Sequence, residues 1–119
     1  MILVEERAGK LNVKLASFED VCEAVYSIVL LIPIGHVTYY KNIAKLLGIH
    51  PRLVAKCLAR NRNIIVVPCH RVIYKNGGIG GYSALGSDFK EKLLSLEGVE
   101  VVNHRVSKKN FFDLGRFLN

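Results

Sequence analysis

Prolines and glycines divide this chain into short segments and so limit the helices that it can form. Pro33 and Gly35 separate two stretches whose apolar residues recur at helical spacing, and Gly48 ends the second stretch. Pro51 suits the first turn of another helix, because proline has a fixed φ and lacks the N–H that an interior helical position needs. With 119 residues the chain is long enough for one compact domain and too short for two. Three short helices are expected, over residues 18–32, 40–47 and from 51 onward.

Residues 40–60 have the pattern of a helix-turn-helix, in which two short helices surround a glycine-containing turn. On the second helix Arg52, Lys56 and Arg60 recur every four residues, and they therefore share one face. Basic, solvated helix surfaces are common, but this is the helix that such motifs present to DNA. The stripe therefore favours a DNA-binding helix over an ordinary solvated face.

The positive charge of the chain is concentrated in its centre. Residues 24–87 contain 8 Lys and Arg and no Asp or Glu, whereas residues 1–23 contain 3 basic and 5 acidic residues. A stretch of this length without a carboxylate indicates a polyanionic partner, and a solubilising surface is the alternative. Nucleic acid is the partner that the charge favours.

The remaining segments predict an α/β domain that is mainly helical. Residues 1–15 alternate apolar and polar around Gly9 and indicate a short hairpin. Ser17 followed by Asp20 is an N-cap signal for the first helix, and the β-branched run at 64–67 indicates a buried strand or extended segment. Further helices are expected over residues 87–97, with Phe89, Leu93, Leu94 and Leu96 facing inward, and within the tail at 103–119.

Three cysteines without a CxxC pair indicate reduced thiols. The chain opens with no signal-peptide pattern, and its longest apolar run, residues 28–34, is too short to cross a membrane. We therefore expect a cytoplasmic protein without membrane contact. Cys22 lies on the apolar face of the first helix and is expected to be a buried core thiol, and Cys57 is expected to pack between helices.

Cys69 is the candidate for a reactive cysteine, because His70 and Arg71 follow it directly. A thiol becomes a nucleophile as its thiolate and needs a base or a positive neighbour. A tight turn at Pro68 would be needed to bring imidazole and sulfur together, and a metal ligand or a structural cysteine are the alternatives. The glycine-rich residues 76–83 lack nucleotide-binding spacing and fit a loop that passes close to a ligand or another segment.

From about residue 18 to residue 98 the chain resembles the O6-alkylguanine-DNA alkyltransferases, also called methylated-DNA–protein-cysteine methyltransferases. The strongest likeness is the PCHRV sequence at residues 68–72, and five other pieces follow the order of the family. These are residues 34–40 with the family tyrosine, 51–54 at the start of the recognition helix, the hinge asparagine at Asn61, the pocket loop at 80–83, and 96–98 with a buried glutamate. The resemblance implies a single domain with a winged-helix-like helix-turn-helix core over residues 17–119, preceded by a short segment over 1–16.

The resemblance also implies how such a domain acts. Arg52 would fill the gap left by a guanine that has rotated out of duplex DNA, and Tyr40 would crowd its phosphate and donate to guanine N3. Cys69 would then take the alkyl group irreversibly, with His70 as its base and Glu97 holding the imidazole. The expected catalytic residues are Cys69, His70, Glu97, Tyr40 and Asn61; the DNA-binding residues are Arg52, Tyr40, Lys56, Arg60 and Lys41; and the pocket residues are Val72, Gly81, Tyr82 and Ser83.

The expected partner is double-stranded DNA containing O6-alkylguanine, bound by a monomer that uses no cofactor and no metal. The chain departs from the family in its short N-terminal segment, in Ala55 and Lys56 where many members have a glycine, and in Arg62 to Ile64 after the hinge asparagine. A non-catalytic sensor of alkyl damage, or another helix-turn-helix DNA binder, is the first alternative. Such sensors replace the nucleophile, often by tryptophan, and this chain has Cys69 and no tryptophan. A cysteine hydrolase unrelated to DNA is the second alternative.

Overall fold

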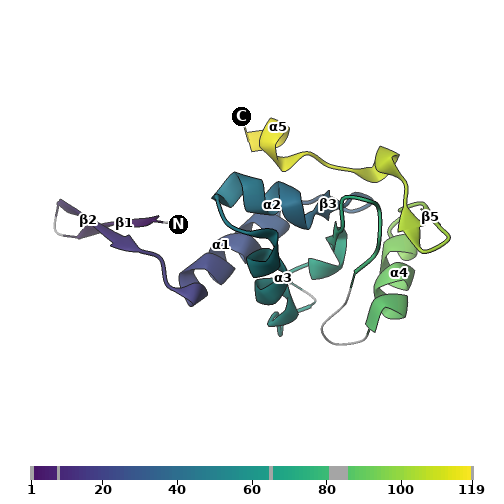
Figure 1. The fold of residues 1–119 in the computed structure, drawn as a ribbon, viewed down its shortest axis with the longest axis horizontal. Helices are drawn as coiled ribbons and strands as arrows, with labels where there is room; N and C mark the ends of the chain where they lie inside the picture. The colour runs from purple at the N-terminus through teal and green to yellow at the C-terminus, as the bar shows by residue number, and fades with distance from the viewer. Residues whose placement is uncertain (1, 8, 65, 81–85, 119) are drawn as a thin grey trace.

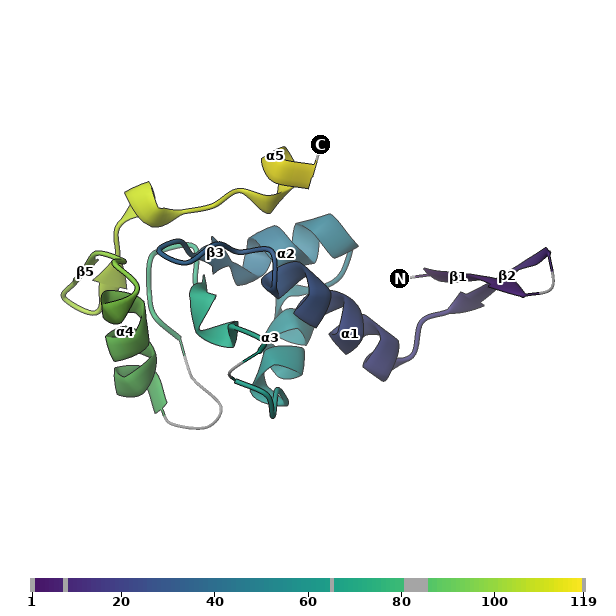
Figure 2. The ribbon, with the colours of Figure 1, turned by 180° about the vertical axis from the view of Figure 1, so that it is seen from behind.

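The computed structural model describes residues 2–7, 9–64, 66–80 and 86–118, and it has a helical body from which an N-terminal hairpin projects (Figures 1 and 2). The strands are β1 (Ile2–Arg7), β2 (Lys10–Leu15), β3 (Thr38–Tyr39), β4 (Val72–Ile73), β5 (Val101–Val102) and β6 (Arg105–Val106). The α-helices are α1 (Phe18–Val29), α2 (Tyr40–Leu47), α3 (Pro51–Ala59), α4 (Gly86–Leu96) and α5 (Leu114–Leu118). Two 3-10 turns complete the set, η1 (Cys69–Arg71) and η2 (Lys108–Asn110). Within these described residues no helix is long and apolar enough to pass through a bilayer.

The N-terminal hairpin is confirmed as an antiparallel pair, β1 and β2, with Ile2 opposite Leu15 and Arg7 opposite Lys10. It lies apart from the helices in both ribbon views. The elements that position the functional residues all lie in the helical body.

Local signals set the ends of α1, α2 and α3. The Ser17 side chain accepts from the Asp20 N–H at 3.2 Å, and Asp20 accepts from the Ser17 N–H at 3.0 Å, which completes a capping box. Gly48 ends α2 with φ of 68°, in the left-handed region that favours glycine. Pro51 opens α3, where the His50 side chain accepts from the Arg52 N–H at 3.0 Å. The expected helix-turn-helix is thus present as α2 and α3, packed on α1.

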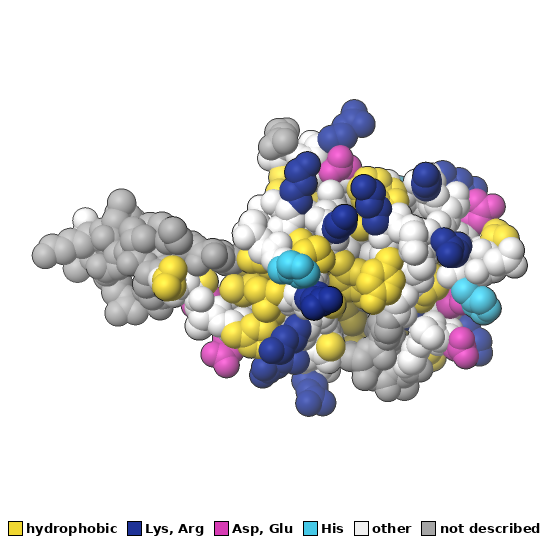
Figure 3. All heavy atoms as spheres, viewed as in Figure 1, with side chains coloured by type: hydrophobic (Ala, Val, Ile, Leu, Met, Phe, Trp, Pro, Cys, Tyr) yellow, Lys and Arg dark blue, Asp and Glu magenta, His cyan; other side chains and the backbone are white. Residues whose placement is uncertain are grey.

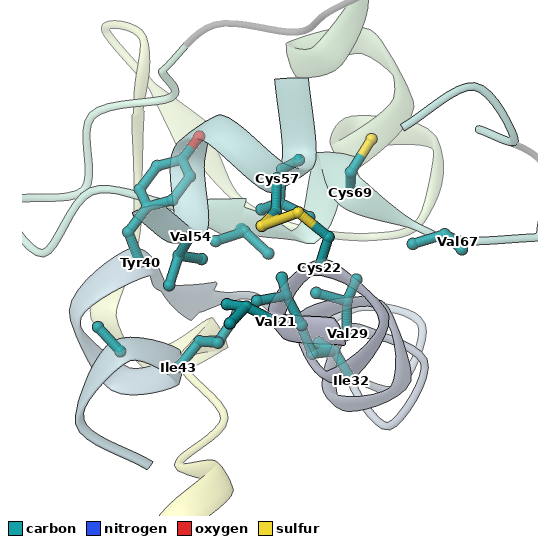
Figure 4. Close-up of a cluster of buried hydrophobic side chains, with 14 of the residues drawn as sticks. Val21, Cys22, Val29, Ile32, Tyr40, Ile43, Val54, Cys57, Val67 and Cys69 are labelled. Atoms are coloured by element: carbon teal, nitrogen blue, oxygen red, sulfur yellow. A yellow bond between two sulfur atoms is a disulfide. The ribbon is translucent and has the colours of Figure 1, made fainter. Parts of the chain in front are cut away.

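The cysteines of α1 and α3 correct the expectation of reduced thiols. Cys22 and Cys57 form a disulfide, drawn in Figure 4, and Cys69 is the free cysteine. Because both cysteines face the core from packed helices, their Cα atoms come within 5.0 Å, although 35 residues separate them in the sequence. Tyr26 reinforces the same contact by donating from its hydroxyl to the Cys57 carbonyl at 2.6 Å. The cysteine count therefore no longer argues for a reducing compartment.

Residues 64, 66 and 67 of the apolar run lie in a turn and a bend, and no strand is present at these described positions, so the expectation of a buried strand there is wrong. The side chains of Asn61 and Asn63 hold this backbone: Asn61 donates to the Val67 carbonyl at 3.1 Å, and Asn63 accepts from the Val66 N–H at 3.4 Å. Such local bonds compete with strand pairing. Val66 is 56% exposed in consequence. The strand that forms instead is β4, which pairs in parallel with β3.

The helix expected over residues 87–97 is present as α4, but its inner face differs. Phe89 is 40% and Leu96 84% exposed, whereas Lys90 and Leu94 are fully buried. The reason is the polar site beneath the helix, which gives the Lys90 ammonium hydrogen-bond acceptors. After α4 comes a short hairpin, β5 and β6, that the sequence did not predict, and its turn places Asn103 and His104 at positive φ. The expected tail helix is present as α5.

Candidate functional site

The nucleophile candidate lies on a tight turn. Pro68 precedes η1, in which the Arg71 N–H donates to the Pro68 carbonyl at 3.0 Å and the Val72 N–H donates to the Cys69 carbonyl. This turn is the feature that the Cys69 and His70 pairing requires. Cys69 and His70 are 5% and 6% exposed, so both side chains are removed from bulk water. In Figure 4 the Cys69 sulfur points away from the disulfide.

Glu97 receives three hydrogen bonds from the residues after Cys69. His70 Nε2 lies 2.9 Å from Glu97 Oε1, and Arg71 approaches the same carboxylate with Nε at 3.0 Å and Nη2 at 2.7 Å. The third nitrogen of the guanidinium donates to the Ile32 carbonyl at 2.9 Å. The fork of Arg71 thus fixes the carboxylate in a bidentate geometry, and the carboxylate fixes the imidazole. The structure brings His70 and Glu97 together as expected, and it adds Arg71, which the sequence did not assign to the site.

The electrostatics of this cluster keep the imidazole neutral and the carboxylate charged. Burial lowers the pKa of His70 below its usual 6.5, although the hydrogen bond and charge of Glu97 oppose that change. Burial opposes the ionisation of Glu97, but the hydrogen bonds from Arg71 and His70 outweigh it and lower the pKa of that carboxyl. A neutral imidazole in contact with an ionised carboxylate can accept a proton at neutral pH.

Lys90 is a second residue of this cluster that the sequence did not assign to the site. Its ammonium is fully buried and donates to the Val72 carbonyl at 2.7 Å and to the Tyr40 hydroxyl at 3.3 Å. Burial lowers its pKa to about 8, and the nearby Cys69 opposes that change. The available signal was helical spacing, because Lys90 shares a face of α4 with Leu94 and is followed seven residues later by Glu97.

Tyr40, at the start of α2, faces the same site. Its ring is 8% exposed and lies 5.0 Å from the ring of Tyr74, measured between centroids. Burial, with smaller contributions from Tyr74 and Cys69, raises the pKa of Tyr40 far above its usual 10.0, so its hydroxyl remains a proton donor at all working pH values. Val72 is fully buried, and its carbonyl already accepts from Lys90 while keeping a second lone pair.

The other expected catalytic residue, Asn61, is buried in the loop after α3. Besides its bond to Val67, its side-chain oxygen accepts from the Asn63 N–H at 3.0 Å. Asn61 therefore shapes the connection between α3 and η1 without contacting the Glu97 cluster through any bond in the described chain. Gly81, Tyr82 and Ser83 of the expected pocket lie outside the described residues.

Basic side chains cover the face formed by α2 and α3, with acidic ones at its margins (Figure 3). Arg52, Lys56, Arg60 and Lys41 are all exposed there. Lys56 and Arg60 lie over the ring of Phe18, at 5.2 and 5.1 Å from its centroid. Arg52 instead borders a hollow of about 540 Å³ that reaches Tyr40. We call it the Arg52 hollow, and its walls are Tyr40, Lys41, Pro51, Arg52, Ala55, Tyr74, Lys75 and Asn76.

The arrangement offers a buried thiol, a neutral base and a proton donor beside a cationic surface. Among the described residues no three His, Cys, Asp or Glu side chains come together as a metal site. The thiol, the imidazole and the hydroxyl are groups that can act as a nucleophile, a base and a proton donor.

Comparison with known sequences gives two consistent findings. Residues 20–99 match the family model described as "6-O-methylguanine DNA methyltransferase, DNA binding domain". A methylated-DNA–protein-cysteine methyltransferase of Saccharolobus islandicus is 49% identical over 78 residues, which cover 66% of this chain and 50% of that protein. The chain thus spans about half the length of the curated relatives that it matches.

Two solved structures resemble the chain. The O6-methylguanine-DNA methyltransferase of Pyrococcus kodakaraensis is 42% identical with a TM-score of 0.61, and the likeness covers 70% of this chain and 50% of that one. Atl1 of S. pombe, in complex with damaged DNA containing O6-carboxymethylguanine, is 29% identical with a TM-score of 0.66. There the likeness covers 73% of this chain and 83% of that one.

Proposed function

Because the chain belongs to the 6-O-methylguanine DNA methyltransferase family, we propose that it repairs O6-alkylguanine in duplex DNA by moving the alkyl group onto its own Cys69. In this proposal residues 17–119 are the catalytic and DNA-binding domain. The observation that carries it is the His70 to Glu97 hydrogen bond of 2.9 Å directly beside the buried Cys69. A neutral, oriented imidazole next to a thiol is what sulfur nucleophiles need.

The reaction is a displacement at the alkyl carbon. The Cys69 sulfur forms a bond to that carbon while the bond from carbon to guanine O6 breaks, and the bonding electrons stay with the base. His70, through a water molecule, takes the thiol proton, and Glu97 with Arg71 stabilises the imidazolium that forms. Tyr40 donates to guanine N3 as the leaving base gains charge, and Lys90, which donates to the Tyr40 oxygen, supports that polarisation.

The surface around Arg52 would deliver the base. Arg52 is exposed at the first turn of α3 and borders the hollow that leads to Tyr40. A long, flat cation there can enter the duplex, hydrogen-bond, and stack where the guanine has left. Lys41, Lys56 and Arg60 would bind phosphates on either side.

Intact mass measurement tests the proposal directly. After incubation with an oligonucleotide duplex containing O6-methylguanine, the chain should gain the mass of one methylene group, located on Cys69, once per molecule. Cys69→Ala should bind the same duplex and gain nothing. An unchanged wild-type mass despite binding would overturn the proposal.

A second test separates delivery of the base from folding. Arg52→Ala should slow methyl transfer by at least an order of magnitude, as expected for a residue that stabilises the flipped state, with no change in melting temperature. Arg60→Ala, on the same helix, is the matched control and should transfer at close to the wild-type rate under saturating DNA. Equal losses of melting temperature and transfer in Arg52→Ala would contradict the role.

Recognition of alkyl damage without transfer is the second candidate. It is favoured by the extent of the likeness to Atl1, which covers 83% of that chain, against 50% of the Pyrococcus enzyme. Cys69 and its base distinguish the two candidates, since a protein that only recognises damage has no use for either. Specific binding without methylated Cys69 would be the result that selects this candidate.

A further inference from the structure

A second hollow, of about 480 Å³, lies beside the Arg52 hollow on the same face. We call it the Phe111 hollow, and its walls are Tyr39, Lys41, Asn42, Ala44, Lys45, Ile49, Pro51, Lys75 and Phe111. Three of these residues, Lys41, Pro51 and Lys75, also line the Arg52 hollow. The two hollows therefore lie side by side and share a wall.

We propose that the Phe111 hollow binds the DNA backbone next to the flipped nucleotide, so that the C-terminal tail is part of the DNA-binding surface. The identity of the lesion in this inference rests on the proposed function. The contact between the hollow and DNA does not depend on which lesion is bound. It extends the interface beyond residues 20–99, which match the family, because Phe111 lies outside that range.

The tail is built firmly into this hollow. The Val37 N–H donates to the Asn110 carbonyl at 2.9 Å, and the Phe112 N–H donates to the Val37 carbonyl at 2.8 Å, so the tail runs beside the segment that enters β3. The Phe111 ring stacks on Tyr39 with centroids 4.2 Å apart and planes within 5°. The stacked pair is half-buried, and it forms a fixed apolar wall.

Asn42 locks the end of the tail onto α2. Its side-chain oxygen accepts from the Leu114 N–H at 3.1 Å and from the Thr38 hydroxyl at 2.9 Å, and its amide donates to Asp113 at 3.2 Å. Leu114 is fully buried against the core. The hollow is therefore preformed, with its shape set by hydrogen bonds and not by the ligand.

The chemistry of the walls fits a phosphodiester with its sugar. Lys41, Lys45 and Lys75 are exposed ammonium groups around one concavity, and each can pair with a phosphate oxygen. The edges of Tyr39 and Phe111 offer an apolar surface for the deoxyribose. The acidic group at this site, Asp113, is already bonded to Asn42 and to the Gly115 N–H at 3.0 Å.

Lys45→Ala isolates this hollow, because Lys45 lines it and not the Arg52 hollow. Binding of an undamaged duplex should weaken by roughly eightfold at about 0.1 M salt, and the slope of log K against log salt should become shallower by about 0.9, as for one lost phosphate contact. Lys92→Ala is the matched control, since Lys92 is exposed on α4 and borders a hollow with Asp88 and Glu91. A Lys45→Ala slope equal to that of wild type and Lys92→Ala would overturn the proposal.

A pair of phenylalanines tests the tail itself. Phe111→Ala should weaken binding several-fold, whereas Phe117→Ala, at an exposed tail position that packs on Phe112 outside the hollow, should not. Melting temperatures report whether Phe111→Ala releases the tail. If it does, Phe111→Leu keeps the apolar wall and should restore binding. The proposal would be contradicted if Phe111→Ala and Phe111→Leu both bound the duplex as tightly as Phe117→Ala.

A duplex series identifies the occupant. Single uncharged methylphosphonates are placed in turn at the phosphates around O6-methylguanine, and binding is measured with wild type and Lys45→Ala. At one position within two nucleotides of the lesion, the methylphosphonate should weaken binding by wild type but not by Lys45→Ala. If the methylphosphonate weakened binding by both proteins equally at every position, the assignment would be refuted. Methylation of Cys69 is read on the same samples, so failure of the proposed function appears separately from failure of the hollow.

Discussion

Two Glu–His pairs, one with its glutamate on α4 and one with its glutamate directly after α4, have the same separation in opposite surroundings. Glu97 meets His70 at 2.9 Å with side chains 18% and 8% exposed, and Glu91 meets His104 at 2.9 Å with side chains 27% and 81% exposed. Burial lowers the pKa of His70, whereas the hydrogen bond and charge of Glu91 raise the pKa of His104. The distance between two groups therefore does not decide their protonation, because the solvent around them does.

The difference indicates which pair can perform chemistry. In the exposed pair the hydrogen bond and charge of Glu91 favour the protonated imidazole, because they raise the pKa of His104. The buried pair is a neutral base held by a carboxylate, and Arg71 supplies the charge that balances Glu97. Of the two pairs, the buried one has the imidazole with the lowered pKa, and its His70 directly follows the free cysteine Cys69.

The largest expected effect comes from removing the charge of the buried pair. Glu97→Gln leaves the Arg71 guanidinium facing a neutral amide, and it should lower the free energy of unfolding by about 2 kcal/mol, as for the loss of hydrogen bonds to a charged group. It should also slow methyl transfer by about 100-fold, the lower end of general-base contributions. Glu91→Gln, on α4, should leave both melting temperature and transfer unchanged. Similar losses in the two variants would break the distinction between the pairs.

Lys90 extends the comparison to a buried cation on α4. Its pKa falls from 10.5 to about 8 on folding, so the unfolded chain binds more protons between these values and stability rises with pH across that window. The gain should be about 3 kcal/mol between pH 8 and 10.5. Denaturant unfolding of wild type and Lys90→Met across this range measures it. A wild-type profile parallel to that of Lys90→Met would show that Lys90 is not buried as a cation.

The two histidines should titrate on opposite sides of 6.5. Proton-detected NMR of the imidazoles is expected to show His70 protonating below this value and His104 above it. For His70 the unfolded chain protonates first, so its contribution to stability is present above 6.5 and is lost as the pH falls. For His104 the contribution is present below 6.5 and is lost as the pH rises through its folded pKa. Coincident titrations would remove the electrostatic contrast between the pairs.

Elements set by neighbouring residues could be predicted from the sequence. Ser17 and Asp20, Gly48 and Pro51 act on their own helix ends, and they correctly predicted the start of α1, the end of α2 and the start of α3. The end of α1 was expected at residue 32, whereas the helix ends at Val29. The strand expected at 64–67 failed because side chains of nearby asparagines bond its backbone, which a pattern of apolar residues does not reveal.

Site residues could be predicted from the sequence only where they belong to a recognised motif. The PCHRV sequence pointed to Cys69 and His70, and the resemblance supplied Glu97, which lies 27 residues further along the chain. In the sequence Arg71 is a positive neighbour of Cys69, and Lys90 resembles a surface cation. Only the folded arrangement shows the carboxylate and the carbonyl to which they donate. Long-range partners of this kind depend on packing, which local composition does not encode.

The disulfide between Cys22 and Cys57 determines how many free thiols each molecule has. Two of its three thiols are withdrawn from titration, so a thiol reagent applied without reductant should find one group per molecule after unfolding, and none once Cys69 carries an alkyl group. Under the proposed function, the number of free thiols that a sample loses then equals the number of alkyl groups that its molecules have accepted. Under that proposal each molecule accepts one alkyl group, because it has one free thiol.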